Sequence, residues 1–307
     1  MIPDQRFQKQ PKAFWATVRL VSQRLGYVTR VRSGIGPIKV PTLNEIARAL
    51  ESAHLDPHHV LQSPGVGNEL GALLCDYFQY RAEVLNDFVR TQLMDRVQAQ
   101  TEFTALRQQH PTVSIPMNKQ SGEKKVESYL SGMVNILVKS TVGDFPCDYD
   151  PRQLTTLTRD RVPLRTFSRR FDGAFPSVVN PIAIWEIKEY YFTTTFGSRV
   201  ADGVYESLLD GLELEEVHDH EGIHVLHYLI VDAYNTWWNK GRSYLCRIID
   251  MLQMGYVDEV LFGREIVKRL PTLARTWMEI AKARGVDDET SEPPGIAKEG
   301  DSSASKA

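Results

Sequence analysis

Three charged side chains in the middle of the chain have the types and spacing needed for hydrolytic chemistry. Glu186 and Lys188 stand one residue apart at the end of the apolar run 182–185. Side chains two positions apart in a strand point to the same face, so this carboxylate and this amine should lie side by side. Asp172 lies 14 residues before Glu186, about the length of a strand, a turn and a return. Antiparallel pairing would therefore bring a second carboxylate beside the first.

Burying these charges at the end of a core strand costs free energy unless they pair or bind something. Two carboxylates offer the hard oxygen ligands that Mg²⁺ prefers, and Mg²⁺ keeps several of its water molecules in proteins. Such an ion polarises a phosphodiester and lowers the pKa of an attacking water. Lys188 could orient or deprotonate that water, or stabilise charge that develops on phosphorus. The alternative is a purely structural ion pair between Glu186 and Lys188.

At these positions the sequence resembles the PD-(D/E)XK nuclease superfamily, which includes many type II restriction endonucleases. The matching residues are Asp172 and the triplet Glu186-Ile187-Lys188. Phe171 stands where the signature has its proline, a residue that binds no metal. The resemblance extends over residues 120–265 and includes the expected order of helices and strands.

The resemblance implies a role for each matching residue. Asp172, Glu186 and the main-chain carbonyl of Ile187 would bind the metal, and Lys188 would be the catalytic lysine. Many members carry a further acid on their first helix, and Glu127 is the best match here, with Glu123 one turn earlier. The implied activity is Mg²⁺-dependent cleavage of double-stranded DNA that leaves 5′-phosphate and 3′-hydroxyl ends. Because a symmetric target is matched by a two-fold protein, we expect a homodimer.

Alternating helical and strand patterns predict an α/β fold with a mixed central sheet flanked by helices, as in restriction endonucleases. Helices are expected over 122–140, 198–212 and 241–254, and strands over 182–192, 223–232 and 257–262. Residues 166–179 are expected to form a hairpin or two short strands. We expect a mainly helical N-terminal region over 1–115, a catalytic domain over 116–284 and a disordered tail over 285–307. In the N-terminal region, Thr42 and Glu45 form a capping-box pattern that predicts a helix near 43–53.

Basic side chains gather in two parts of the chain. Residues 1–50 contain nine basic residues against two acidic ones, although the whole chain has a net charge of −3. A face that binds a polyanion would need such an asymmetry, and solvated surface charge is the alternative. The candidate DNA contacts are Arg165, Arg169 and Arg170 before Asp172, Lys240 and Arg242 at the start of a helix, and Arg30 and Arg32 for base reading.

Composition narrows the class of protein. The chain has 307 residues, of which 42% are hydrophobic and 24% charged, and this suits a globular fold with a sizeable core. Its near-neutral charge excludes a globally basic nucleic-acid coat. The three cysteines are widely spaced, which argues against a disulfide framework and against a structural zinc site. Such cysteine usage favours a cytoplasmic location. No apolar run approaches the roughly 18–20 residues that span a bilayer, so we expect no membrane association.

Other motifs point less clearly to chemistry. The segment 218–224 contains His218, His220 and His224 and could bind a transition metal, but it lacks zincin spacing and favours a solvated loop. Glycine-rich phosphate loops are absent from the sequence. We therefore expect a sequence-specific type II restriction enzyme. The alternatives are a non-catalytic DNA-binding regulator on a nuclease-like scaffold and a structure-specific repair or mobile-element nuclease.

Overall fold

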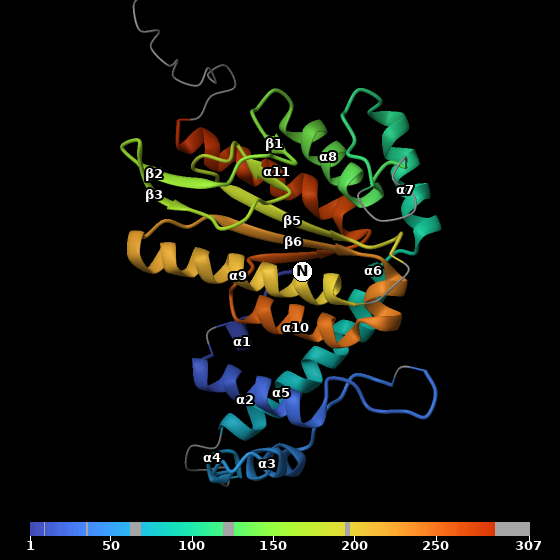
Figure 1. Cartoon of the computed structure of the whole chain (residues 1–307), viewed down its shortest axis with the longest axis vertical. Helices are drawn as coiled ribbons and strands as arrows, with labels where there is room; N and C mark the ends of the chain where they lie inside the picture. The colour runs from blue at the N-terminus through green and yellow to red at the C-terminus, as the bar shows by residue number, and fades with distance from the viewer. Residues whose placement is uncertain (9, 35, 62–68, 119–125, 194–196, 286–307) are drawn as a thin grey trace, which may run out of the picture.

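The computed structural model describes residues 1–8, 10–34, 36–61, 69–118, 126–193 and 197–285. Its centre is a five-stranded sheet in the order β1-β4-β5-β6-β7 (Figure 1). The strands are β1 (Asp148–Tyr149), β4 (Gly173–Phe175), β5 (Ala183–Glu189), β6 (Leu226–Asp232) and β7 (Glu259–Phe262). β1, β4 and β5 pair antiparallel, whereas β5, β6 and β7 pair parallel. The expected mixed α/β sheet is confirmed.

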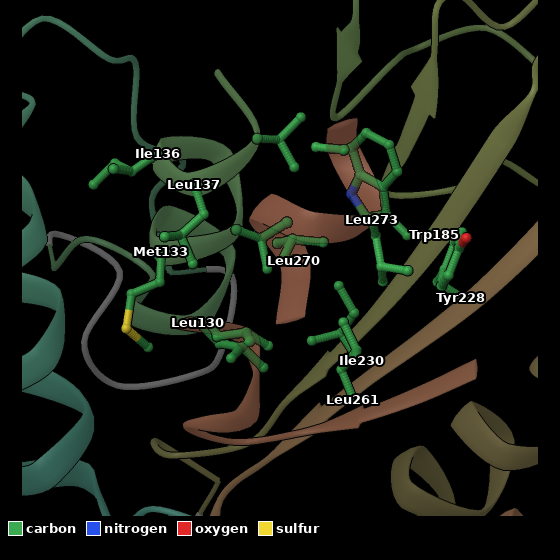
Figure 2. Packing of buried hydrophobic residues seen from close by; sticks show 14 of the residues in the cluster. Leu130, Met133, Ile136, Leu137, Trp185, Tyr228, Ile230, Leu261, Leu270 and Leu273 are labelled. Carbon is green, nitrogen blue, oxygen red and sulfur yellow. The ribbon is translucent and has the colours of Figure 1, made fainter. Parts of the chain in front are cut away.

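Helices cover both faces of the sheet because its central strands are apolar on both sides. On one face lie α8 (Tyr129–Val142) and α11 (Glu265–Ala283), and on the other α9 (Ser198–Glu221) and α10 (Arg242–Gln253). Figure 2 shows the core on the α8 and α11 face, in which Leu130 of α8 and Leu270 and Leu273 of α11 lie toward the strands. The strands β2 (Thr156–Arg159) and β3 (Val162–Thr166) form a separate two-stranded hairpin outside the central sheet.

The N-terminal region is helical, as expected, and has a core of its own. It contains α1 (Gln5–Gln8), α2 (Lys12–Leu25), α3 (Leu43–Glu51), α4 (His58–Leu61) and α5 (Glu69–Glu83), which pack around buried aromatic residues. The capping box of Thr42 and Glu45 is formed at the start of α3. After α5 come the π-helical turn η1 (Val84–Val89), α6 (Arg90–Gln92) and α7 (Arg96–Gln109). Phe103 of α7 lies in the same core as α8, so this helix packs with the sheet-containing part although it falls within the expected N-terminal region 1–115.

Several element boundaries differ from the expected ones. The helix expected over 122–140 begins at Tyr129, and the helix expected over 198–212 continues to Glu221. Within 166–179, only Gly173–Phe175 pairs in the central sheet. Between β6 and α10 lies a second π-helical turn, η2 (Asn235–Lys240). The tail expected to be disordered, beyond residue 285, lies outside the described residues.

Candidate active site

The three predicted residues converge where β4 meets β5. Asp172 directly precedes β4, and its main-chain N–H donates to the Trp185 carbonyl at 3.0 Å. Its carboxylate accepts a hydrogen bond from the Ile187 N–H, with 2.7 Å between Oδ2 and the nitrogen. Asp172, Glu186, Ile187 and Lys188 line one cavity of about 230 Å³. The antiparallel return that the spacing predicted is therefore present and brings the carboxylates to a common cavity.

Glu186 and Lys188 are buried and directly paired. Their side chains are 5% and 7% exposed, and 2.6 Å separates Lys188 Nζ from Glu186 Oε1. The same carboxylate oxygen accepts a second hydrogen bond from Arg169 Nη2 at 2.7 Å. The other oxygen, Oε2, is buried and has no hydrogen-bond partner among the described residues. Glu186 thus has one oxygen saturated by cations and one oxygen free to take a ligand.

Electrostatics fix the charge states of this pair. Burial disfavours the charge on Glu186, but Lys188 and Arg169 outweigh burial and hold the pKa of the carboxyl below its usual value. Burial also disfavours the charge on Lys188, but Glu186 and Glu206 outweigh it and raise the pKa of the ammonium group. At neutral pH the site therefore contains a carboxylate and an ammonium ion.

Acidic residues of α9, the helix that covers one face of the sheet, contact the cations of the site. Lys188 Nζ lies 2.9 Å from Glu206 Oε2, and Arg169 Nη1 lies 2.7 Å from Asp210 Oδ2. Burial, only partly offset by Arg169, raises the pKa of Asp210 to about 7. The spacing of these acids, followed by Glu213, puts them on one helical face. The spacing of these acids in the sequence predicts that they share a helical face. The sequence near them does not indicate which cations they contact.

The arginines that precede Asp172 have different surroundings from one another. Arg165 pairs with Glu213 and Glu216 of α9, at 3.0 and 2.8 Å. Arg169 is held by Glu186 and Asp210, as described above. Arg170 is exposed and lines a neighbouring cavity of about 450 Å³ together with Asp172. Of the three predicted DNA contacts in this cluster, Arg170 therefore presents the most accessible charge.

The remaining wall of the 230 Å³ cavity comes from the start of α8. Ser131 and Asn135 of that helix line the cavity. Glu189, which follows Lys188 on β5, accepts hydrogen bonds from the N–H groups of Tyr129 and Ser131, at 2.9 and 3.0 Å. The strand that carries the candidate site thus also caps the helix that closes it, because a carboxylate satisfies the free N–H groups of a helix N-terminus.

The acid expected on the first helix is elsewhere. Glu127 precedes α8, forms a bridge with Met117 and has its carboxylate 3.9 Å from Arg107. It is not among the residues that line the cavity. Glu123 lies outside the described residues. Asp150, by contrast, lines this cavity and both neighbouring ones, of about 450 and 660 Å³.

The side chains present suit a divalent cation that needs few protein ligands. Within the described ranges, no three His, Cys, Asp or Glu side chains are grouped so as to hold a metal ion. Mg²⁺, however, is commonly held by one or two carboxylates and completes its shell with water. The unpaired Oε2 of Glu186, with Asp172 lining the same cavity, matches that requirement.

The three histidines of segment 218–224 lie at and just after the end of α9. His218 and His220 lie in the last turn of α9, which is a helix and not the expected loop. His224 Nε2 lies 3.4 Å from Asp258 Oδ1, and this contact raises the pKa of the imidazole. The side chains of His218 and His224 contact each other edge to face.

The other predicted DNA contacts lie outside the cavity. Arg30 and Arg32 are exposed in the segment between α2 and α3, which contains a bridge between Val28 and Ile38. Lys240 is exposed at the end of η2, and Arg242 is half-buried at the start of α10.

A comparison with protein families matches most of the sheet-containing part. A family model described as "Domain of unknown function (DUF7687)" matches residues 94–277. The chain belongs to this family. A second model, "Domain of unknown function (DUF7690)", matches residues 1–88. The DUF7687 part contains the sheet and all three candidate residues.

Searches of curated proteins and of solved structures found no match. Among the described residues, no helix is both long enough and apolar enough to cross a membrane.

Proposed function

We propose that the chain is a Mg²⁺-dependent endodeoxyribonuclease of the type II restriction class, built on a restriction-endonuclease-like sheet. The observation that carries this proposal is the convergence of Asp172, Glu186 and Lys188 on one cavity. The resemblance to PD-(D/E)XK nucleases rests on the same three residues. Their placement at the junction of an antiparallel and a parallel strand pair supports it further.

Asp172 and Glu186 would hold the metal, with the Ile187 carbonyl as a further ligand. When bound, Mg²⁺ would polarise the phosphodiester and supply an activated water. Glu186 would bind through the oxygen that is free of Lys188 and Arg169. The two cations keep this carboxylate ionised, which is the form that a metal requires.

Lys188 acts as a cation and not as a base. An ammonium group whose pKa is raised cannot take a proton from water at neutral pH. Its three N–H donors can instead stabilise negative charge that develops on the phosphoryl oxygens. Of the three roles considered for Lys188, deprotonation of the water is therefore excluded from the proposal. Lys188 would orient the water and stabilise the transition state.

The cavities around Asp150 fit a phosphodiester backbone. Three cavities share this residue, and two of them are lined by exposed cations, Arg170 in one and Lys139 and Arg152 in the other. Cations beside carboxylates attract a polyanion while leaving a metal site within it. Double-stranded DNA is the proposed substrate, and a homodimer would cut both strands.

A second candidate is a non-catalytic DNA-binding protein. It is favoured by one observation, namely that Lys188 and Arg169 both bind Glu186 Oε1. In a site of that kind the three charges would form a structural network only. Such a protein would bind DNA but would not cut it in the presence of Mg²⁺.

The test is incubation of plasmid and phage DNA with the protein and Mg²⁺, with EDTA as the negative control. We expect discrete fragments that EDTA abolishes, whereas cutting confined to branched DNA would favour a structure-specific nuclease. Asp172→Asn and Lys188→Met should each lower the rate by about 100-fold or more. Asp202→Asn, an exposed acid on α9, is the matched control and should keep full activity. Unchanged cleavage by both site variants, or no cleavage of any DNA, would overturn the proposal.

A further inference from the structure

Two arginines far apart in the sequence share one buried indole. Trp238 lies in η2 and is 3% exposed. The guanidinium carbon of Arg242 lies 4.4 Å from the centroid of this ring, and that of Arg90 lies 5.7 Å from it. Arg90 begins α6, immediately after η1. Both π-helical turns of the described structure therefore end at this pair, and such turns are frequent at functional sites.

Neither guanidinium has an acidic partner. Arg242 donates to two main-chain carbonyls, that of Trp238 at 2.9 Å and that of Gly36 at 3.0 Å. Among the described residues, no carboxylate lies within ion-pair distance of Arg90 or Arg242. Arg81, Arg165 and Arg169 by contrast all bind carboxylates.

Two like charges on one indole, without an acidic partner, favour binding of an anion. Partial burial and the charge of Arg90 both lower the pKa of Arg242, so each disfavours its charged form. An anion bound near both guanidiniums would weaken the repulsion between them. Arginine also presents a planar fork of donors that suits phosphate oxygens.

Further exposed cations lie in the chain segments that contact Arg242. Lys240 is exposed and lies two residues before Arg242. The carbonyl that Arg242 binds belongs to Gly36, in the same segment as the exposed Arg30 and Arg32. Several positive charges beside one another fit a ligand with repeated negative charges better than a single phosphate ion.

The pair is connected to the candidate active site through Tyr190. Tyr190 lines the 230 Å³ cavity, two residues after Lys188. Its carbonyl accepts a hydrogen bond from Thr236 Oγ1 at 3.2 Å, and its ring lies 5.6 Å from that of Trp237. Both contacts are made by η2, which also carries Trp238. η2 thus packs against a residue that lines the cavity and also carries the indole on which the arginine pair lies.

We propose that Arg90 and Arg242, packed on Trp238, form a clamp for the phosphodiester backbone of duplex DNA. The clamp is separate from the chemistry at Asp172, Glu186 and Lys188, but its assignment to DNA rests on the proposed function. It holds the backbone and reads no bases, because phosphate contacts position a duplex without specifying its sequence.

The test measures binding without cleavage. Fluorescence anisotropy of a labelled 30-base-pair duplex would be recorded in EDTA over a series of salt concentrations. We expect Arg90→Gln to weaken binding by about fivefold at 0.1 M salt and to reduce the salt slope by about one. Arg242→Gln should do the same, but it also loses structural hydrogen bonds, so its melting temperature must be compared. The matched control is Arg275→Gln, an exposed arginine of α11 on the other face of the sheet.

The outcomes separate this proposal from the nuclease proposal. Weaker binding by Arg90→Gln together with Mg²⁺-dependent cleavage by the wild type supports both. Weaker binding without any cleavage keeps the clamp and overturns the nuclease. Binding by Arg90→Gln equal to that of Arg275→Gln in affinity and salt slope overturns the clamp, as does a wild-type protein that does not bind duplex DNA.

Discussion

Asp232 is a fully buried acid at the end of β6. Its carboxylate accepts hydrogen bonds from the N–H groups of Met94 and Ala233, both at 2.8 Å, and from the Tyr191 hydroxyl. Burial outweighs these hydrogen bonds and raises the pKa of Asp232 from 3.8 to about 7. The side chain therefore keeps a proton in the folded protein at pH values where the unfolded chain releases it.

This difference makes the free energy of unfolding depend on pH. Between about pH 4 and 7 the folded state binds more protons at Asp232 than the unfolded state, so this residue's contribution to stability falls as pH rises. Asp232→Asn removes that dependence. Relative to the wild type, we expect the variant to gain about 2 kcal/mol or more between pH 4.5 and 7.5, measured by urea unfolding. Asp202→Asn, which is exposed, should show no such gain, and parallel pH profiles of Asp232→Asn and the wild type would contradict the expectation.

The convergence of Asp172, Glu186 and Lys188 could be predicted because it depends on local rules. Strand alternation fixes the relation of Glu186 to Lys188, and a single antiparallel return fixes that of Asp172. The contacts of Arg169 with Glu186 and Asp210 could not be predicted in the same way. They depend on how α9 lies across the edge of the sheet, and that placement follows from packing over the whole unit.

At the scale of elements, β4 can lie close to β5 only because Gly173 has no side chain. A Cβ at this position would lie 2.0 Å from the indole of Trp185. That indole cannot move aside easily, since it stacks on Trp277 with 5.5 Å between centroids and 7° between planes. The glycine therefore sets the separation of the strands that position Asp172 and Glu186.

Gly173→Ala should destabilise the fold by about 3 kcal/mol, the upper part of the range for overpacking in a core. Any protein that remains folded should lose cleavage activity, because the displaced strand carries Asp172 with it. Gly197→Ala is the control, since a Cβ there would meet nothing within 4 Å. Thermal unfolding and plasmid cleavage would be measured on both variants. A melting temperature of Gly173→Ala equal to that of Gly197→Ala would show that β4 has room for a side chain.

Helix boundaries show which signals are local and which are not. α9 ends at Glu221 because Gly222 adopts a left-handed conformation with φ 68°, and a glycine after a helix is a stop signal visible in the sequence. The start of α8 has no equivalent local signal. Its N–H groups bind Glu189, a residue on a distant strand, so the helix begins where tertiary structure supplies the cap.

At the scale of the whole molecule, the N-terminal helices are joined to the sheet-containing part by a buried ion pair. Arg81 of α5 is 1% exposed, and its Nη1 lies 2.9 and 3.1 Å from the two carboxylate oxygens of Asp250 in α10. The Tyr77 hydroxyl donates to the same carboxylate at 2.5 Å. A buried charge of this kind is tolerated only while its partner is present.

Arg81→Met should therefore lower the free energy of unfolding by about 3–5 kcal/mol, because it leaves Asp250 buried without a cation. Arg159→Met is the matched control. Arg159 forms an exposed pair with Glu221 at 3.0 Å, and losing such a pair costs less than about 1 kcal/mol. Urea unfolding would be followed by tryptophan fluorescence, with Trp15 in the N-terminal core and Trp277 in the core of the sheet. If Arg81→Met were no less stable than Arg159→Met, the ion pair between Arg81 and Asp250 would not be what holds the two parts of the chain together.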